Sequence, residues 1–297
     1  MKHRTPYFLL AALVLLTGLL PGCAGAVPSE STAASPEPVS TAAETALPVE
    51  EELKLWCFDA GKADAFLLYN SAGAVLIDTG EAGFGKTVLA KLEELGIDRL
   101  SCLIITHFDK DHVGGAKKIL NSIPVDLVLQ SNCPKSGADA YENYLQALEK
   151  QGIEPVTVRA DTELRLGDAV LLVNPPARDT YPVSASNNSS LILTVTHGSN
   201  RLLFLGDAED LRLTEFLQTE PGHFDLVKLP HHGRWHGVFP TLLEQITPRY
   251  AVLTASEDEP EDERTLTLLA EQGVQALQTR YGAFAVVSDG ASITPHP

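Results

Sequence analysis

Four side chains that commonly bind metal ions lie within six consecutive positions of this 297-residue chain. They are His107, Asp109, Asp111 and His112, and they follow directly after the apolar run 102–105. Imidazole and carboxylate groups suit divalent cations of hard or borderline character. A strand that ends in a loop lets such side chains converge, whereas within a strand they would alternate between two faces. We therefore predict that all four residues bind metal.

A simpler interpretation of this segment is that Asp111 caps a helix over residues 113–120 while the other charged groups are solvated. Capping requires only one acidic side chain and leaves the remaining three groups unexplained. Metal binding is therefore the better interpretation. The paired glycines Gly114 and Gly115 are expected to let the backbone turn tightly beneath the metal and into that helix.

The segment resembles the first metal motif of the metallo-β-lactamase superfamily, with Asp109 in place of the usual second histidine. This variant is similar to the motif of the ComEC competence family. A second segment, residues 58–66, resembles the entry motif of ComEC soluble domains, although Lys62 and Ala63 replace its Gln and Gly. Further matching segments follow in the family's order, at residues 77–80, 186–190, 204–207 and 229–233. The resemblance covers roughly residues 53–294, and ordered motifs are far more specific than any single one.

The resemblance implies an α/β (α+β) fold, the four-layer αββα metallo-β-lactamase sandwich, with the metal site at one edge between the sheets. It also implies that Asp207, which follows the apolar run 202–205 and a glycine, bridges two metal ions. Asp78 and Asp64 would support the metal ligands through hydrogen bonds.

The histidine pair His231 and His232 follows the apolar segment 224–230, again at the end of a predicted strand. In the family, one such histidine completes the second metal site together with Asp111 and His112. Alternation along a strand would point the two imidazoles in different directions, so only one of them can be the direct ligand. The sequence leaves open which one it is.

The first metal site, formed by His107, Asp109 and Asp207, lacks the third histidine that is common in the superfamily. His197 lies in a segment that is typical of a hairpin turn, and we do not expect it to bind metal. The segment 187–189 occupies the family position instead, and its amide and hydroxyl oxygens are weak, hard ligands. Oxygen donors move the preference from zinc towards manganese or magnesium. We therefore expect one or two divalent ions, Zn or Mn, with one tight and one weak site.

A metal-bound water makes hydrolysis the predicted reaction class, because the metal lowers the pKa of the water and neutralises charge on the attacked group. The ComEC resemblance implies cleavage of phosphodiesters, particularly of nucleic acid. Asp111 and Asp207 are the expected catalytic metal ligands. His236 is the candidate proton donor to the leaving group.

Two residues are candidate contacts for the substrate. Arg234 replaces the serine that usually follows the His-His-Gly motif, and its guanidinium could grip a phosphate. Asn188, in the segment that replaces the third histidine, is the other.

Two other function classes remain open. A non-catalytic, metal-binding surface lipoprotein would keep the fold without turnover, and the weak first site favours this alternative. A hydrolase of a carbonyl substrate, similar to a β-lactamase, is disfavoured by Asp109 and by the missing histidine.

The N-terminal fifty residues differ in composition from the rest of the chain. Residues 1–23 resemble a bacterial lipoprotein signal peptide with a lipobox, and Cys23 is the expected site of lipidation. Residues 24–50 are rich in Ala, Ser, Pro and Glu, which is typical of a disordered tether, and residues 51–297 are the predicted hydrolase domain. We expect an exported protein that is anchored to the membrane through lipid and faces the extracytoplasmic side.

The formal net charge of the chain is -17, and such a surface repels long polyanions. We therefore expect a phosphodiester substrate such as short or single-stranded nucleic acid or an envelope polymer. A small basic rim could still hold one anionic group; its candidates are Lys110, Lys117, Lys118 and Arg234. The sequence does not identify a protein partner. Three cysteines remain after Cys23, and this odd count argues against a disulfide framework.

Hydrophobic periodicity predicts strands interspersed with helices over the whole hydrolase domain. The predicted strands are 53–58, 65–69, 74–77, 102–105, 125–129, 169–173, 190–196, 201–205, 224–229, 274–278 and 282–288. The predicted helices are 85–95, 113–120, 138–151, 210–218, 239–246 and 261–272.

Overall fold

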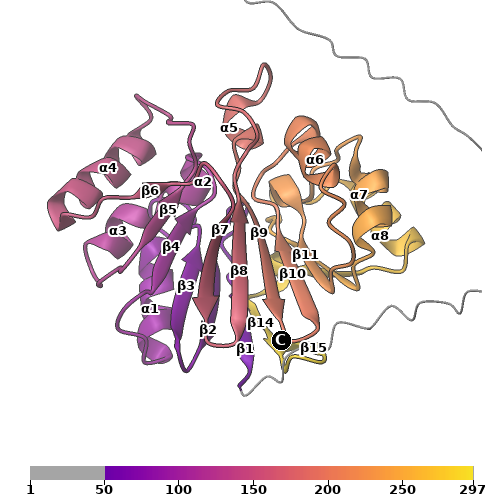
Figure 1. The fold of residues 1–297 in the computed structure, drawn as a ribbon, viewed down its shortest axis with the longest axis horizontal. Coiled ribbons are helices and arrows are strands. Elements are labelled where there is room, and N and C mark those ends of the chain that lie inside the picture. Colours follow the sequence, from indigo (N-terminus) through magenta and orange to yellow (C-terminus); the bar gives the residue numbers. More distant parts are fainter. Residues whose placement is uncertain (1–50, 297) are drawn as a thin grey trace, which may run out of the picture. The chain divides into compact units, whose positions relative to one another are not determined.

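Residues 51–296 are described by a computed structural model, in which two β-sheets pack face to face and helices cover the outer side of each (Figure 1). The predicted signal peptide, the predicted tether and the lipidation site at Cys23 lie outside the described residues. The four-layer αββα sandwich is confirmed.

The first sheet has eight strands and carries its helices on one side (Figure 1). In spatial order its strands are β15 (Ile293–His296), β14 (Phe284–Ser288), β1 (Leu53–Cys57), β2 (Phe66–Asn70), β3 (Gly73–Ile77), β4 (Cys102–Ile105), β5 (Val128–Gln130) and β6 (Val156–Thr157). The helices on its outer side are α1 (Gly85–Glu94), α3 (Ala116–Leu120) and α4 (Asp139–Gln151).

The second sheet has seven strands and packs against the inner face of the first sheet. Its strands are β13 (Gln275–Gln278), β12 (Tyr250–Leu253), β11 (Leu226–Lys228), β10 (Asn200–Phe204), β9 (Ile192–His197), β8 (Ala169–Asn174) and β7 (Thr162–Leu166). Its outer helices are α6 (Asp210–Leu217), α7 (Phe239–Ile246) and α8 (Glu263–Glu271). The short elements are α2 (Lys110–Val113), α5 (Ala185–Asn188) and two 3₁₀ turns, η1 (Pro230–Gly233) and η2 (Thr279–Tyr281).

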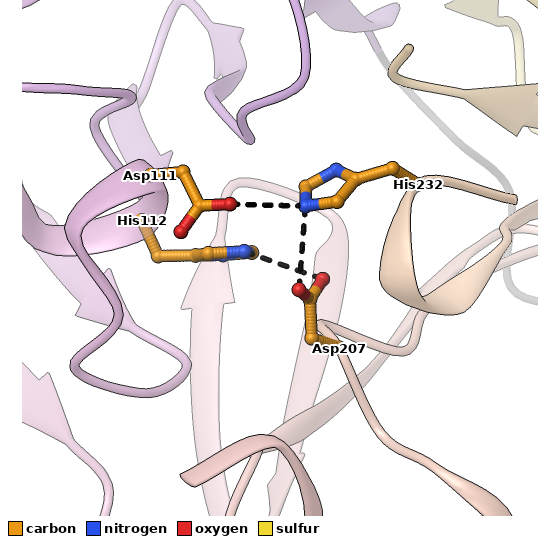
Figure 2. Close-up of side chains that lie close together, drawn as sticks. All are labelled: Asp111, His112, Asp207 and His232. Atoms are coloured by element: carbon orange, nitrogen blue, oxygen red, sulfur yellow. Dashed lines mark ion pairs between the residues drawn. The ribbon is translucent and has the colours of Figure 1, made fainter. Parts of the chain in front are cut away.

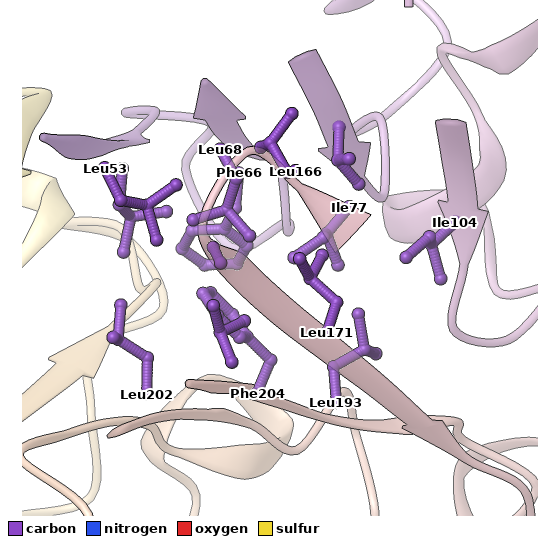
Figure 3. Packing of buried hydrophobic residues seen from close by; sticks show 14 of the residues in the cluster. Leu53, Phe66, Leu68, Ile77, Ile104, Leu166, Leu171, Leu193, Leu202 and Phe204 are labelled. Atoms are coloured by element: carbon purple, nitrogen blue, oxygen red, sulfur yellow. The ribbon is translucent and has the colours of Figure 1, made fainter. Parts of the chain in front are cut away.

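The central strands of the first sheet can be buried on both faces because most of their residues are apolar. In β2, Phe66 and Leu68 point into the core between the sheets, and Leu67 points towards the helices of the first sheet. Figure 3 shows the core between the sheets, where Phe66 meets Phe204 of the facing sheet with ring centroids 5.5 Å apart. This apolar core fixes the distance between the two sheets and therefore the spacing of the groups at their edges.

The candidate site depends on the direction of the strands at the centre of each sheet. The pairs β3 with β4 and β10 with β11 are parallel, so their carboxyl ends meet at the same edge of the sandwich. A backbone hydrogen bond from Leu191 N to Thr106 O, 2.9 Å long, joins the two sheets at this edge. The loops that carry the predicted metal ligands all start there.

The predicted helix over 113–120 is wrong in one respect, because the segment forms two short helices, α2 and α3, separated by Gly114 and Gly115. Both glycines have negative φ, so the backbone does not need them for a tight turn. They are required by close packing, since a Cβ on Gly115 would lie 2.3 Å from Thr79 O.

The other predicted elements are present with ends shifted by a few residues, and several short elements were not predicted. The strands β6, β7, β12 and β15 and the helix α5 belong to this group. Two of them have weak patterns: β6 has two residues, and β7 carries polar side chains on its exposed face. The three cysteines among the described residues are free, and no helix in residues 51–296 is long and apolar enough to cross a membrane.

Candidate metal centre

Four side chains from distant parts of the chain converge at the shared edge of the two sheets, as Figure 2 shows. One potential ligand atom from each of Asp111, His112, Asp207 and His232 lies within 4.8 Å of the other three. His232 Nε2 is 3.3 Å from an oxygen of Asp111 and 3.3 Å from Asp207 Oδ2, and His112 Nε2 is 3.2 Å from Asp207 Oδ1. Two imidazoles and two carboxylates at these separations form a mixed nitrogen and oxygen donor set.

Each ligand is placed by a short element at a strand end. Asp111 and His112 lie on α2, directly after β4, and Asp207 follows β10. His232 lies in the 3₁₀ turn η1, after β11, and both His231 and His232 have left-handed backbone angles, with φ of 50° and 58°. The prediction that the histidine pair alternates at the end of a strand is therefore wrong. A non-glycine residue with positive φ is strained by about 1–3 kcal/mol, and such residues cluster at functional sites.

Asp78 orients His112. His112 Nδ1 lies 2.7 Å from Asp78 Oδ2, and the same carboxylate accepts hydrogen bonds from the backbone N–H and the hydroxyl of Thr106. The Asp78 side chain is fully buried and its φ is 55°. With its Nδ1 held by a carboxylate, His112 presents Nε2 to the other three ligand candidates.

Asp64 and Thr254 orient His232 in the same way. His232 Nδ1 lies 3.0 Å from Thr254 Oγ1 and 3.3 Å from Asp64 Oδ1, and the Thr254 hydroxyl donates to Asp64. Asp64 comes from the loop between β1 and β2, and Thr254 follows β12, so both sheets contribute. His232 Nε2 therefore points into the centre, while His231 does not belong to the converging group.

The centre has the donor atoms that a divalent metal ion needs. Three buried atoms there have no hydrogen-bond partner: His112 Nε2, His232 Nε2 and Asp207 Oδ1. Burial opposes charge on the imidazoles, but the carboxylates around them dominate, so that the pKa of His112 lies well above its usual value and the pKa of His232 is raised to about 10. The carboxylates that raise the pKa of these imidazoles attract any cation. A bound metal ion would therefore displace the imidazole protons. The residues fit a metal ion.

Lys228, at the end of β11, is a buried cation that the sequence analysis did not identify. Its ammonium contacts Asp64, lies 3.7 Å from Asp207 Oδ1 and donates to Gly206 O at 3.0 Å. Only 1% of its side chain is exposed. A lysine is almost never fully buried unless it is paired, so its place within the predicted strand 224–229, between Val227 and Leu229, was the available signal.

His107 and Asp109, predicted for the first metal site, lie beside the converging group but outside it. The His107 ring is 4.1 Å from the His112 ring, and its Nε2 is buried without a hydrogen-bond partner. Asp109 Oδ1 is 3.8 Å from His107 Nε2. The same oxygen is 2.6 Å from the ammonium of Lys135 and accepts a hydrogen bond from the Ser186 hydroxyl.

His231 and His236 form a second imidazole pair next to the centre, with ring centroids 5.5 Å apart. His231 lines the adjoining cavity, whereas His236 lies behind it and does not. Burial lowers the pKa of His231 to about 4 and also lowers the pKa of His236. Imidazoles with lowered pKa values are neutral near pH 7 and can donate hydrogen bonds, and the role of His236 as a proton donor stays a prediction.

The two predicted substrate contacts are not on the cavity wall. Asn188 is buried, because its amide donates to Val183 O and accepts from Arg212 N; its neighbour Asn187 lines the cavity instead. The prediction for Asn188 is therefore corrected. Arg234 is more than half exposed and lies 3.9 Å from Glu259.

A cavity of about 490 Å³ opens beside the candidate metal centre. Its charged lining residues are three lysines and four aspartates, namely Lys62, Lys110, Lys135, Asp109, Asp111, Asp139 and Asp207, and His231 lies beside them. Lys110 was predicted for this rim, but Lys117 hydrogen-bonds Asn143 on α4 and, like Lys118, does not line the cavity. Lys62 could have been found from its place in the 58–66 motif, two residues before Asp64.

His197, which the sequence analysis assigned to a turn, ends β9 at a hairpin and is buried away from the centre. Its ring nitrogens lie 2.8 Å from Ser288 Oγ and 3.1 Å from Glu51 O. Both nitrogens are engaged by groups at the opposite end of the sheets, so the interpretation as a turn residue agrees with the fold.

Known proteins resemble this chain in sequence and in fold. Residues 59–256 match the profile of the metallo-beta-lactamase superfamily. ComE operon protein 3 of Bacillus subtilis is 28% identical over 245 residues, which cover 74% of this chain and 31% of that protein. Recombination protein 2 of Haemophilus influenzae is 28% identical over 218 residues, covering 68% of this chain and 24% of that protein. The chain thus spans a third or less of the length of these relatives.

Among solved structures, the metallo-beta-lactamase fold protein YhfI from Bacillus subtilis is similar in fold. The TM-score is 0.53 at 15% sequence identity, and the match covers 80% of this chain and all of that one. This likeness concerns the fold alone. The narrower resemblance to ComEC-type competence proteins, drawn above from the motifs, is confirmed by the two sequence relatives.

Proposed function

Because the chain belongs to the metallo-β-lactamase superfamily of metal-dependent hydrolases, we propose that it is a phosphodiesterase that acts on short or single-stranded nucleic acid or on an envelope polymer. One observation carries the proposal. A centre with the donor atoms for a divalent ion opens onto a cavity whose wall carries three lysines beside four aspartates, on a chain whose net charge is -17. With a divalent ion bound to Asp111 and Asp207, the ion and the lysines would together favour a substrate that carries its own negative charge.

In this proposal a divalent ion is held by Asp111, His112, Asp207 and His232, with His107 and Asp109 available to a second ion. The bound ion would supply an activated water and neutralise charge on the attacked phosphoryl group. The two imidazoles favour zinc and the carboxylates favour manganese, so both metals are candidates.

The residues of the chain have separate tasks around that ion. Asp78 and Asp64 hold the imidazoles so that Nε2 faces the metal, and Lys228 holds Asp64 and Asp207 in place. The ammonium groups on the cavity wall attract the phosphate. His231, neutral near pH 7 and on the same wall, can donate a hydrogen bond to a phosphoryl or leaving-group oxygen.

The relatives support a phosphodiester substrate. Both matched proteins are of the ComEC competence type, for which nucleic acid is the expected substrate. The low coverage of these relatives limits the comparison to this one domain. Export and attachment to a membrane through Cys23 are part of the same proposal, and they rest on the N-terminal sequence.

The test is hydrolysis of a small activated diester, bis-nitrophenyl phosphate, and of short oligonucleotides by the purified protein. We expect turnover that EDTA abolishes and that Mn²⁺ restores better than Zn²⁺. Asp207→Asn should lose turnover and bind metal weakly, since this carboxylate contacts both imidazoles of the centre. Asp139→Asn, an equal change of charge on the cavity wall outside the cluster, should leave metal binding unchanged.

Three outcomes would redirect the assignment. If the metal-loaded protein hydrolyses no diester, the non-catalytic metal-binding lipoprotein becomes the better assignment. Turnover of a chromogenic cephalosporin without turnover of diesters would favour the carbonyl hydrolase. Full activity of Asp207→Asn at saturating metal would refute the proposed centre.

A further inference from the structure

Asp109 differs from the other two predicted carboxylate ligands, Asp111 and Asp207, because an ammonium lies within hydrogen-bond distance of its side chain. Its Oδ1, the oxygen that lies 3.8 Å from His107 Nε2, is also 2.6 Å from Lys135 Nζ and accepts from the Ser186 hydroxyl. A carboxylate oxygen of a metal ligand must direct a lone pair at the metal. Here two donors from the protein already compete for that oxygen.

Lys135 comes from outside the motifs that supply the metal ligands. It lies in the loop between β5 and α4, and Ser186 lies on α5 of the other half of the chain. Both segments meet over Asp109. The Lys135 side chain is 41% exposed, so its ammonium remains in contact with the cavity while it is paired to a carboxylate that is only 27% exposed.

The other half of the centre has no such competitor among the described residues. Asp111 and Asp207 offer oxygens to His232 and His112, whose Nε2 atoms have no hydrogen-bond partner. Lys228 does not line the cavity; it contacts Asp64 and lies 3.7 Å from Asp207 Oδ1. The three lysines of the cavity wall pair with Glu259, Glu81 and Asp109, so none of them is paired with Asp111 or Asp207.

We propose that the ammonium of Lys135 takes the place of a second metal ion at Asp109, so that the protein holds one divalent ion tightly and a second only after Lys135 is displaced. The proposal rests on the metal centre of the proposed function but not on the reaction. Two cations cannot share the Asp109 oxygen without strong mutual repulsion, because a half-buried site screens charge less than water does.

This arrangement places one positive charge beside Asp109, the residue that would otherwise bind the second ion. The ammonium is mobile on a four-carbon stem, and an anionic substrate or a metal ion can draw it away from Asp109. His107 then remains as an imidazole whose Nε2 is buried and unpaired until a second ion arrives.

The experiment is equilibrium dialysis of the metal-free protein against Mn²⁺, with metal analysis and electron paramagnetic resonance of the bound ion. The native protein should bind one Mn²⁺ per chain with high affinity and give the six-line spectrum of an isolated ion. Lys135→Met, which keeps the length and the apolar stem, should bind a second Mn²⁺ at least about tenfold more tightly than the native protein does. Its spectrum should change to that of two coupled ions.

Two further variants decide whether the effect runs through Asp109. Lys62→Met removes another lysine of the same cavity, one that pairs with Glu259 and touches no ligand candidate, so the metal stoichiometry should stay as in the native protein. In the double variant Lys135→Met with Asp109→Asn, the second ion should be lost again.

Two results would overturn the inference. One is a native protein that binds two coupled Mn²⁺ ions as tightly as Lys135→Met does. The other is a Lys135→Met variant, folded by circular dichroism, that still binds one ion. Because no arm measures turnover, absence of diesterase activity would count against the proposed function and leave this inference standing.

Discussion

The orientation of two imidazole rings decides whether the centre can hold a metal ion. His112 and His232 each have Nδ1 next to a buried aspartate, and in both rings the free Nε2 faces Asp207. A ring rotated about its Cβ–Cγ bond would offer carbon in place of nitrogen. The carboxylates behind the rings, Asp78 and Asp64, are therefore as necessary as the ligands themselves.

Lys228 is the residue that keeps this concentration of buried carboxylates together in the metal-free protein. We expect Lys228→Met to lower the free energy of unfolding of the metal-free protein by about 3 kcal/mol, since removal of one partner leaves a buried charge uncompensated. Saturating Mn²⁺ or Zn²⁺ should recover part of the loss, because the ion again supplies positive charge beside Asp207. Urea unfolding with and without metal measures both quantities.

The matched control for this variant is Lys86→Met on α1, where the lysine is exposed. Its unfolding free energy should change by less than about 0.5 kcal/mol in either state. An equal loss for Lys228→Met with and without metal would mean that the ammonium only packs the core and has no electrostatic part in the centre.

Metal affinity should rise with pH because protons and metal compete for His232. The surrounding carboxylates, Asp207 first, overcome burial and raise its pKa to about 10 in the metal-free protein, so at neutral pH the metal must displace a proton. For each proton that the metal displaces, the metal affinity should rise about tenfold per pH unit until the pH reaches that pKa. Calorimetric titrations in two buffers of different ionisation enthalpy measure the number of protons released.

The same pKa predicts how the stability of the metal-free protein varies with pH. A folded-state pKa raised above the unfolded value of about 6.5 contributes stability that is complete below that pH and is lost as the pH rises through about 10. Metal-free protein should therefore melt at a lower temperature as the pH rises towards 10, and metal-loaded protein should not. Metal binding that is independent of pH would contradict the assignment of His232.

At the scale of elements, the pair α2 and α3 positions Asp111 and His112 against the first sheet. The close approach of Gly115 to Thr79 makes this possible, and Thr79 in turn donates from its N–H and its hydroxyl to His112 O. Thr79 follows Asp78 directly. The contact between the backbones of Gly115 and Thr79 therefore sets the distance between His112 and the Asp78 carboxylate that orients it.

Gly115→Ala should therefore disturb both the fold and the metal centre. A Cβ there would lie 2.3 Å from Thr79 O, and the backbone must move to relieve the clash, at a cost of about 1–3 kcal/mol in unfolding free energy. Metal affinity should fall as well, because His112 and Asp78 move apart. Thermal melting and metal titration test the two effects.

Gly83→Ala is the matched control, since a Cβ at Gly83 meets no atom within 4 Å. It should melt like the native protein and bind metal equally well. Loss of stability in Gly115→Ala with native metal affinity would show that α2 adjusts independently of α3.

For the whole molecule, the net charge of -17 limits how nucleic acid can bind. Within residues 51–296, the lysines of the cavity wall are the three cations placed to meet phosphates at the cavity, so binding of a single strand should have a shallow salt dependence. With about 0.7 ions released per contact, the slope of log affinity against log salt should be no steeper than about -2. Fluorescence anisotropy with a labelled oligonucleotide over a salt series measures it.

Long duplexes should bind more weakly than short single strands in the same assay, because the acidic surface repels them. A slope steeper than about -5 would require an extended basic track and would contradict this account. Lys62→Met should make the slope shallower by about 0.7, which separates a phosphate contact from a general effect of charge.

The N-terminal segment allows one more prediction for the whole molecule. Cys23→Ala should move the protein from the membrane fraction to the soluble exported fraction, because a lipid on Cys23 is the proposed anchor. Cell fractionation followed by immunoblotting measures the distribution. Equal retention of the variant on membranes would indicate an anchor other than lipid on Cys23.

The sequence by itself predicted the fold, through the family resemblance, and it predicted the residues that converge at the candidate centre. Apolar runs that end in His, Asp or Gly located the strands, and the order of the motifs indicated the family. His107, Asp109, Asp111, His112 and Asp207 are adjacent to strand ends, and the ends of parallel strands meet at one edge. The local sequence pattern was sufficient to predict these five residues because each of them closely follows the end of its strand.

Only the tertiary structure decided between His231 and His232, because the left-handed turn η1 does not follow the alternation of a strand. It also revealed Lys228 and Lys135 as partners of Asp64 and Asp109, over 164 and 26 positions of sequence respectively. It removed Asn188 from the cavity wall. These contacts depend on how two sheets and their loops pack, and no periodicity along one segment encodes a pairing between segments that far apart.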